Sequence, residues 1–147
     1  MSTKPARSAR ALAVPFVGLC LLLGSGCGGA AQHFGLVGQA AEGPEVRGSV
    51  QVEPIQGGQR IVLVEVQHLP PPERLASGRS AYAVWLHEAD APPTLVGTLD
   101  YDRSQRSGNL FAVTGKSNFV VTVTAEQHAS PALPSELLVA EHRIAGP

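Results

Sequence analysis

The chain has 147 residues, of which 44% are hydrophobic, 5% aromatic and 16% charged, and its formal net charge is −1. This length suits a single domain together with a targeting segment. Because the chain has no surplus of basic residues and no Lys/Arg-rich patch, its composition argues against the nucleic-acid-binding proteins that depend on a positive surface.

The first part of the chain has the pattern of a secretory signal peptide. Three basic residues and no acidic one precede Glu42, and an apolar run of 13 residues covers positions 11–23. A membrane-spanning helix needs about 20 apolar residues, so this run is too short. A positive start, a short apolar stretch and small residues after it are typical of a cleaved export signal. Removal of residues 1–26 leaves eight basic and twelve acidic residues, a net charge of −4.

The end of this segment, Leu23-Gly24-Ser25-Gly26-Cys27, resembles the lipobox of bacterial lipoproteins. The resemblance implies that Cys27 is acylated and becomes the first residue of the mature chain. Gly24 departs from the pattern, which usually has an aliphatic residue there. Cys20 lies in the apolar run, so Cys27 is left as a lone thiol that cannot form an internal disulfide, and acylation accounts for it. Gly28 in place of aspartate implies the outer membrane if the cell has two membranes.

A second cleavage site remains open. Gly29-Ala30-Ala31 has the small-x-small form of an ordinary signal peptidase site. Cleavage there would release a soluble protein that begins at Gln32.

The segment from residue 27 to residue 45 separates the signal from the domain. It is rich in Gly, Ala and Gln, lacks hydrophobic periodicity and ends at Gly43-Pro44. This composition predicts a flexible tether. We expect residues 46–147 to form the folded domain.

The domain alternates apolar and polar residues with a period of two, the pattern of half-buried strands. A triple proline after Leu69 cannot continue a ladder because proline lacks the N–H donor. We expect a loop at 72–78 with one helical turn, and a polar, flexible segment at 100–108. Strands are predicted at 46–53, 60–68, 80–88, 94–99, 110–114, 119–126 and 137–144.

Seven short strands in about 100 residues favour two packed antiparallel sheets. The predicted fold class is therefore all-β, an immunoglobulin-like antiparallel β-sandwich of about seven strands. Trp85 lies on a middle strand, where such a sandwich places its central residue. Tyr82 is three residues away and so points to the opposite face of the strand. The expected core comprises Val50, Val52, Val62, Val64, Val84, Trp85, Leu86, Leu99, Phe111, Phe119, Val121, Val123 and Val139.

Residues 46–144 also resemble the C-terminal, extracytoplasmic domain of anti-sigma-K-type factors. That family has a Tyr-x-x-Trp-Leu strand, a glycine-led strand, and a Val-Thr-x-Glu strand that runs into a Ser/Pro-rich loop. The matching residues here are Tyr82, Trp85 and Leu86, then Gly97-Thr98-Leu99, then Val123-Thr124-Ala125-Glu126, then Ser130, Pro131 and Pro134, and finally Leu137-Leu138-Val139.

The resemblance implies a β-sandwich, sensor-like module outside the cytoplasm. It does not imply binding of a sigma factor, because the chain lacks the family's cytoplasmic helical domain and mid-chain membrane helix. His128-Ala129 also stands where a glycine pair is common.

Metal and catalytic chemistry find little support in the residue spacing. The histidines form no His-x-His or His-x3-His pair, and the aspartates near the loops lack the EF-hand spacing, so they are better explained as turn formers. Gly115-Lys116-Ser117 lacks the first glycine of a phosphate loop, and no Gly-x-Ser-x-Gly elbow follows the signal. We expect no catalytic residue, cofactor or metal site. The candidate ligands for a metal are His33, His68, His87, His128 and His142, with Asp90, Asp100 and Asp102 for calcium.

These patterns together predict an exported, membrane-anchored lipoprotein that faces the periplasm or the cell exterior. Its domain would be non-catalytic and would contact another protein of the cell envelope, in a sensory or regulatory role. The alternative is an envelope lipoprotein that binds a small ligand or a metal, and it predicts a pocket or converging His and Asp side chains.

Overall fold

A computed structural model describes residues 31–38 and 45–145 of the chain. The predicted signal peptide and Cys27 lie outside the described residues. The described part contains no helix with the length and hydrophobicity required to span a bilayer.

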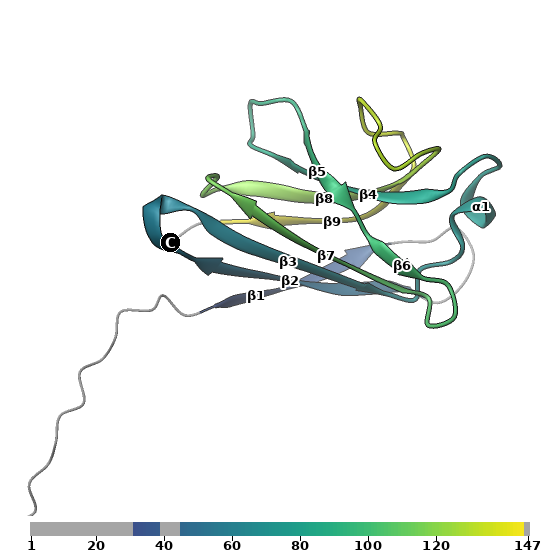
Figure 1. Cartoon of the computed structure of the whole chain (residues 1–147), viewed down its shortest axis with the longest axis horizontal. Helices are drawn as coiled ribbons and strands as arrows, with labels where there is room; N and C mark the ends of the chain where they lie inside the picture. The colour runs from purple at the N-terminus through teal and green to yellow at the C-terminus, as the bar shows by residue number, and fades with distance from the viewer. Residues whose placement is uncertain (1–30, 39–44, 146–147) are drawn as a thin grey trace, which may run out of the picture.

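The described residues form an all-β domain (Figure 1). All seven predicted strands are present, each within one residue of its expected ends except β7, which begins three residues earlier. One helical turn, α1 (Pro72–Leu75), lies in the loop where it was expected. The strands are β1 Gln32–Gly38, β2 Val46–Pro54, β3 Arg60–Gln67, β4 Ala81–His87, β5 Thr94–Thr98, β6 Asp100–Asp102, β7 Ser107–Thr114, β8 Phe119–Glu126 and β9 Leu138–Ile144, with a 3₁₀ turn η1 at Gln56–Gly58.

Two strands arise where the sequence predicted none. Strand β1 (Gln32–Gly38) lies inside the segment 27–45 for which the sequence predicted a flexible tether. Seven residues of β1 pair in antiparallel register with β2, which supplies the partner that no local pattern reveals. Strand β6 and the first residues of β7 form a hairpin within the segment 100–108 that was expected to be flexible.

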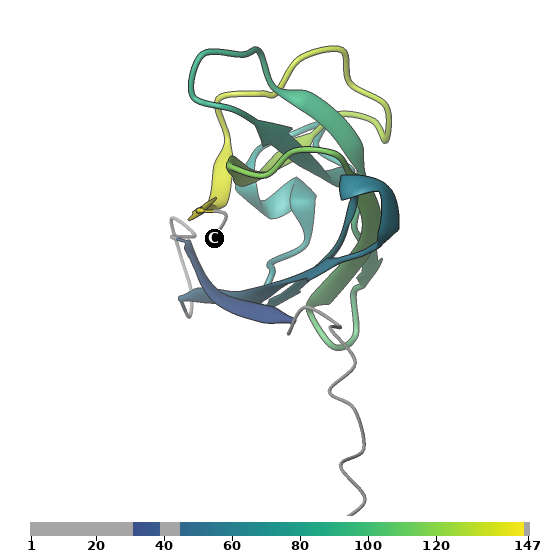
Figure 2. The ribbon, with the colours of Figure 1, turned by 90° about the vertical axis from the view of Figure 1, so that its left-hand side faces the viewer.

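The strands follow one hydrogen-bonded order, β5-β4-β8-β9-β1-β2-β3-β7-β6, with every pairing antiparallel. This order folds back on itself into two facing layers, which Figure 2 shows end-on. We call them the β4 sheet (β5-β4-β8-β9) and the β3 sheet (β1-β2-β3-β7, with β6 at its margin). The layers part between β1 and β9, which pair only at Val37 and Glu141.

The sandwich is immunoglobulin-like in its strand order as well as its layers. Without β1, the order β2-β3-β7-β6 corresponds to strands A, B, E and D of an immunoglobulin domain. The order β5-β4-β8-β9 corresponds to C′, C, F and G. Strand β1 is an addition that lies beside β2, at the edge that faces β9.

Alternating side chains of both sheets fill the core between the layers. Its members include Val50 and Val52 of β2, Val62 and Val64 of β3, and Tyr82 of β4. Burial of these side chains from water is the main stabilising contribution. Twelve of the thirteen expected core residues are buried, and they are Val50, Val52, Val62, Val64, Val84, Trp85, Leu86, Leu99, Phe119, Val121, Val123 and Val139.

The thirteenth expected core residue, Phe111, is 62% exposed, so this expectation is wrong. The pairing of β7 with β3 sets Leu110 opposite the buried Val64 and Ala112 opposite the buried Val62. Since neighbouring side chains on a strand point to opposite faces, Phe111 must then point to solvent.

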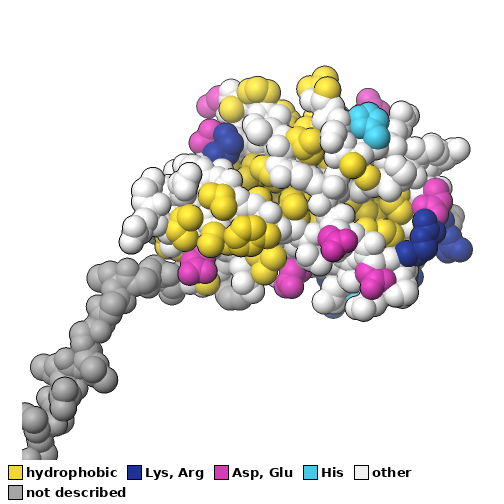
Figure 3. All heavy atoms as spheres, in the orientation of Figure 1, with side chains coloured by type: hydrophobic (Ala, Val, Ile, Leu, Met, Phe, Trp, Pro, Cys, Tyr) yellow, Lys and Arg dark blue, Asp and Glu magenta, His cyan; other side chains and the backbone are white. Residues whose placement is uncertain are grey.

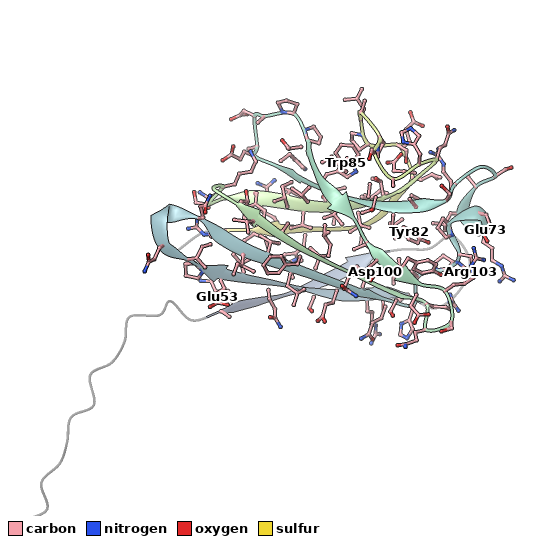
Figure 4. All side chains as sticks on the ribbon, in the orientation of Figure 1. Glu53, Glu73, Tyr82, Trp85, Asp100 and Arg103 are labelled. Carbon is pink, nitrogen blue, oxygen red and sulfur yellow. The ribbon has the colours of Figure 1, made fainter. Side chains whose placement is uncertain are left out.

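Trp85 is buried, but not at the centre of the sandwich. Tyr82, Val84 and Leu86 belong to the core between the layers. Alternation along β4 therefore turns Trp85 to the outer side of the β4 sheet. Figure 4 shows Trp85 on that outer side and Tyr82 between the layers. The expectation that these two aromatic residues point to opposite faces is confirmed.

Candidate functional site

Three connections meet at one end of the sandwich and form the candidate site. We call them the loop platform and define it as residues 68–80, 103–106 and 127–137. The first joins β3 to β4 and contains α1, the second joins β6 to β7, and the third joins β8 to β9 (Figure 1). Hydrogen bonds and ion pairs between neighbouring loops hold the three together.

Local sequence explains the first of these loops. Strand β3 ends before a run of three prolines, which have no N–H group for a ladder. Pro72 then starts α1, a position at which the missing N–H costs nothing. Gly78 takes a φ of 80°, a backbone conformation that favours glycine, and the chain turns there into β4.

Two tyrosine side chains hold the first loop through its backbone carbonyl groups. The Tyr82 hydroxyl donates a hydrogen bond to the carbonyl oxygen of Pro70, and the Tyr101 hydroxyl donates to that of Leu69 at 3.1 Å. The two rings meet edge to face with centroids 5.4 Å apart. Burial raises the pKa of both phenols, so both stay protonated and keep donating near neutral pH.

Arg106 connects the second loop to the first. Its carbonyl oxygen accepts from the Leu69 backbone N–H at 2.8 Å. Its guanidinium donates to the carbonyl oxygens of Leu69 and His68, each at 3.3 Å. Both His68 (φ 62°) and Arg106 (φ 54°) adopt the left-handed conformation, which non-glycine residues rarely take. These hydrogen bonds hold two strained residues in place.

An ion pair adds to this connection at the surface. Arg103 Nη1 lies 2.5 Å from Glu73 Oε1. The hydrogen bond from Arg103 lowers the pKa of the Glu73 carboxyl, and the same bond raises the pKa of Arg103. Both side chains are exposed, so the pair displays one charge of each sign on the platform and adds little to stability.

A buried polar chain holds the third loop. Trp85 Nε1 donates to Thr124 Oγ1 at 2.8 Å, and the Thr124 hydroxyl donates to Glu126 Oε1 at 2.6 Å. The same carboxylate oxygen accepts from the backbone N–H of Ser135 at 2.8 Å. Its second oxygen lies 3.8 Å from Arg79 Nη1, in the first loop. Glu126 is 3% exposed, and these partners account for its burial.

Ser135 and Ser80 complete the attachment. The Ser135 hydroxyl donates to the carbonyl oxygen of Ala125 at 2.8 Å, and the Ser80 hydroxyl donates to that of Gln127 at 2.6 Å. In the part of the chain that the structure describes, no buried side-chain nitrogen or oxygen lacks a hydrogen-bond partner. Loop 127–137 therefore lies fixed over the outer side of the β4 sheet, where Trp85 is buried (Figure 1).

The residues considered for metal binding do not meet. Across residues 31–38 and 45–145, no group of three His, Cys, Asp or Glu side chains is placed to hold a metal ion. Asp102 instead accepts hydrogen bonds from the backbone N–H groups of Ser104 at 2.7 Å and Gln105 at 3.1 Å. The Ser104 hydroxyl, with these N–H groups, lowers the pKa of Asp102. Asp102 is thus a turn former, as its position in the sequence indicated.

The remaining candidates are scattered. His68 and His128 lie in different loops of the platform, and the side chain of His33 lies outside the described residues. His87 lines an open hollow of about 210 Å³ at the opposite end of the sandwich, together with Asn118 and Arg143. Lys116 of the incomplete phosphate-loop pattern pairs with Glu88 at 3.0 Å.

Several residues of the platform were missed by sequence reasoning. Arg79, Arg106 and Ser135 act through contacts with residues far away in the chain or through backbone groups of a folded loop. Only Glu126 carried a signal, as the acidic residue of the Val-Thr-x-Glu motif. The motif residues Trp85, Thr124 and Glu126 join in one hydrogen-bonded chain, so their spacing has a structural cause.

Comparison of the chain with known protein families, with curated proteins and with solved structures finds no match.

Proposed function

We propose that this protein is a lipid-anchored, extracytoplasmic β-sandwich module that acts without catalysis, through contacts with another protein of the cell envelope. The anchor is the acylated Cys27, as the lipobox-like segment implies. The contact surface is the loop platform. A sensory or regulatory role follows from the resemblance of residues 46–144 to the extracytoplasmic domain of anti-sigma-K-type factors.

The observation that carries the proposal is the rigidity of the platform. Tyr82 and Tyr101 hold the first loop and Glu126 holds the third, all three from strands of the scaffold, and the second loop is attached to the first through Arg106 and Leu69. Proteins commonly place recognition residues on loops that a rigid scaffold positions. Loops ordered in advance also lose less conformational freedom when a partner binds.

The exposed residues of the platform suit a protein partner. Leu133 is 72% exposed at the outside of loop 127–137, and an ion pair of Glu73 with Arg103 lies on the neighbouring loops. An apolar side chain near charges of both signs offers both buried area and directional contacts. The position of the platform also fits, because the chain enters the domain at the other end, where Gln32 pairs with Val52.

The anchor is tested first. The intact mass of the protein from a membrane fraction should equal residues 27–147 plus acyl chains, and a Cys27→Ser variant should lose both the added mass and the membrane retention. An unmodified mass that begins at Gln32, in the soluble fraction, would contradict the anchor.

The contact surface is tested in cells with a photo-cross-linking residue. Placed at Leu133, it should give a discrete cross-linked product with one envelope protein, and Glu73→Ala with Arg103→Ala should reduce that product. The matched control carries the cross-linker at Ser117, an exposed residue of the turn between β7 and β8. A product from Ser117 and none from Leu133 would contradict the assignment of the platform.

A further inference from the structure

A group of apolar side chains lies uncovered at the end of the sandwich opposite the loop platform. Phe111 is 62% exposed, Val113 48% and Ile55 36%. The register sets Ile61 beside Val113 and Leu63 beside Phe111, and Ile55 lies in the turn that leads from β2 into β3. We call these five residues the apolar ledge. Figure 3 shows hydrophobic atoms gathered over this part of β3 and β7.

The apolar ledge lies close to the point at which the chain enters the domain. Gln32 is opposite Val52, Val52 is opposite Val62, and Val62 is opposite Ala112. Three strand spacings separate Gln32 from Ala112, a distance of about 14 Å. Phe111 and Val113 flank Ala112 on β7.

The short distance from Cys27 brings the apolar ledge near the membrane. Strand β1 begins at Gln32, five residue steps after Cys27, and five steps of a fully extended chain span at most about 18 Å. An acyl group on Cys27 would therefore keep Gln32 within about 18 Å of the lipid surface, and Ala112, three strands away and between Phe111 and Val113, within about 32 Å. Had residues 27–45 been a free tether, no such restriction would hold.

From this geometry we infer that the apolar ledge rests on the lipid bilayer, with Phe111 and its neighbours in the boundary between head groups and acyl chains. The inference rests on the proposed lipid anchor. The acyl chains bring the domain to the surface, and the ledge then sets its orientation, with the loop platform directed away from the membrane. An exposed aromatic side chain with aliphatic neighbours is what such an interface accepts.

The charges around the apolar ledge determine which lipids suit it. Glu53 is opposite Ile61 across β2 and β3, and Asp100 is opposite Asn109, two residues before Phe111 on β7 (Figure 4). Arg60 and Lys116 lie at the same end, but Lys116 is paired with Glu88. Acidic residues beside the ledge disfavour an anionic surface and also disfavour a second copy of the same face. A zwitterionic lipid surface is therefore the binding partner that these charges favour.

The test uses the acylated protein in vesicles of phosphatidylcholine. An environment-sensitive fluorophore is attached through Ile55→Cys in one sample and through Leu133→Cys, on the loop platform, in another. We expect the label at position 55 to shift to shorter wavelength and to be quenched by doxyl-labelled lipid, and the label at 133 to do neither. A vesicle-bound protein whose label at 55 stays unquenched overturns the inference and leaves the anchor intact.

A second variant distinguishes contact with lipid from contact with a second copy of the chain. Phe111→Thr with Val113→Thr keeps two residues that favour strands and exposes no core atom. In this variant the label at position 55 should lose its quenching while the protein stays on the vesicles. If the unsubstituted protein is instead dimeric in detergent and the variant monomeric, the ledge is an interface between copies, and the lipid assignment is wrong. If the mass shows no acyl group, the anchor and this inference fail together.

Discussion

The outer faces of the two sheets differ, although each carries an aromatic residue that points away from the core. Trp85 on the β4 sheet is 1% exposed, and Phe111 on the β3 sheet is 62% exposed. Loop 127–137 lies on the outer side of the β4 sheet and is attached through Glu126, to which Trp85 is linked by Thr124, whereas the connections next to Phe111 are short turns. The same alternation of residues thus produces a second buried layer on one sheet and an apolar surface on the other.

The difference shows that a connecting loop can decide whether the outward-facing apolar residues of a strand are buried or exposed. A strand with apolar residues on both faces needs a cover on both sides. On the β4 sheet, loop 127–137 of the same chain provides this cover. Its attachment buries the Glu126 carboxylate, which needs several hydrogen-bond partners. The β3 sheet has no such cover in the described residues, and its uncovered side chains are the basis for the proposed contact with lipid.

Replacement of Trp85 by Ala should have the largest effect. The change removes a fully buried ring and a hydrogen bond to Thr124, and we expect a loss of about 3–5 kcal/mol in the free energy of unfolding. Urea-induced unfolding measures it. The matched control, Phe111→Ala, should cost far less; equal losses at both positions would contradict the difference between the two faces.

Glu126→Ala should have the next largest effect. It leaves the N–H group of Ser135 and the Thr124 hydroxyl without their acceptor, and we expect a loss of about 2–3 kcal/mol. Loop 127–137 should also become sensitive to a protease that cuts beside leucine, which limited proteolysis followed by mass spectrometry detects. Glu136→Ala, at an exposed position of the same loop, serves as the control and should change neither quantity.

Alkaline pH should weaken the contact between the two sheets at the tyrosine pair. Burial raises the pKa of Tyr82 and Tyr101 above their value in the unfolded chain, about 10. Their stabilising contribution is therefore complete below about pH 10 and is lost as pH rises through the higher folded-state values. They are the only tyrosines of the chain, so tyrosinate absorbance follows this cluster alone.

We expect the absorbance titration of the folded protein to lie at higher pH than the titration in concentrated urea. Tyr101→Phe should leave a single transition, which belongs to Tyr82. Coincident titrations in the presence and absence of urea would show that the phenols are not buried.

Phe111→Thr should have the smallest effect on stability. The side chain is exposed and threonine favours strands, so the free energy of unfolding should change by no more than about 0.5 kcal/mol. Urea unfolding measures it beside Trp85→Ala. A loss of several kcal/mol would mean that Phe111 is covered in solution.

Much of the fold could be predicted from local pattern. Alternation located seven strands, and the triple proline after Leu69 located a loop. Strand β1 was not predicted, because its Gly- and Ala-rich surroundings show no alternation of apolar and polar residues. Its strand conformation depends on pairing with β2. The expected core was wrong at Phe111, which is exposed, and in the central position given to Trp85, which is buried outside the layers. Leu110 and Phe111 are both apolar, so only the pairing of β7 with β3 shows which of them points inward.

The loop platform could be predicted only in outline. Loops were expected at 72–78 and 130–135, and the Val-Thr-x-Glu motif marked Glu126. The contacts that fix these loops join residues far apart in the chain, such as Arg79 with Glu126 and Arg106 with Leu69. No spacing along the sequence encodes such pairs, because each forms only after strands far apart in the chain have paired, β4 with β8 for the first and β3 with β7 for the second.

The sequence by itself determined the all-β class, the positions of seven strands and the predictions of export and of a lipid anchor at Cys27, because each depends on local periodicity or on a short motif. Only the tertiary structure decided which aromatic residue is covered and which is exposed, because exposure depends on the register between β3 and β7 and on the course of a distant loop. The same register places the apolar ledge beside the start of β1, and so connects the uncovered face to the predicted anchor.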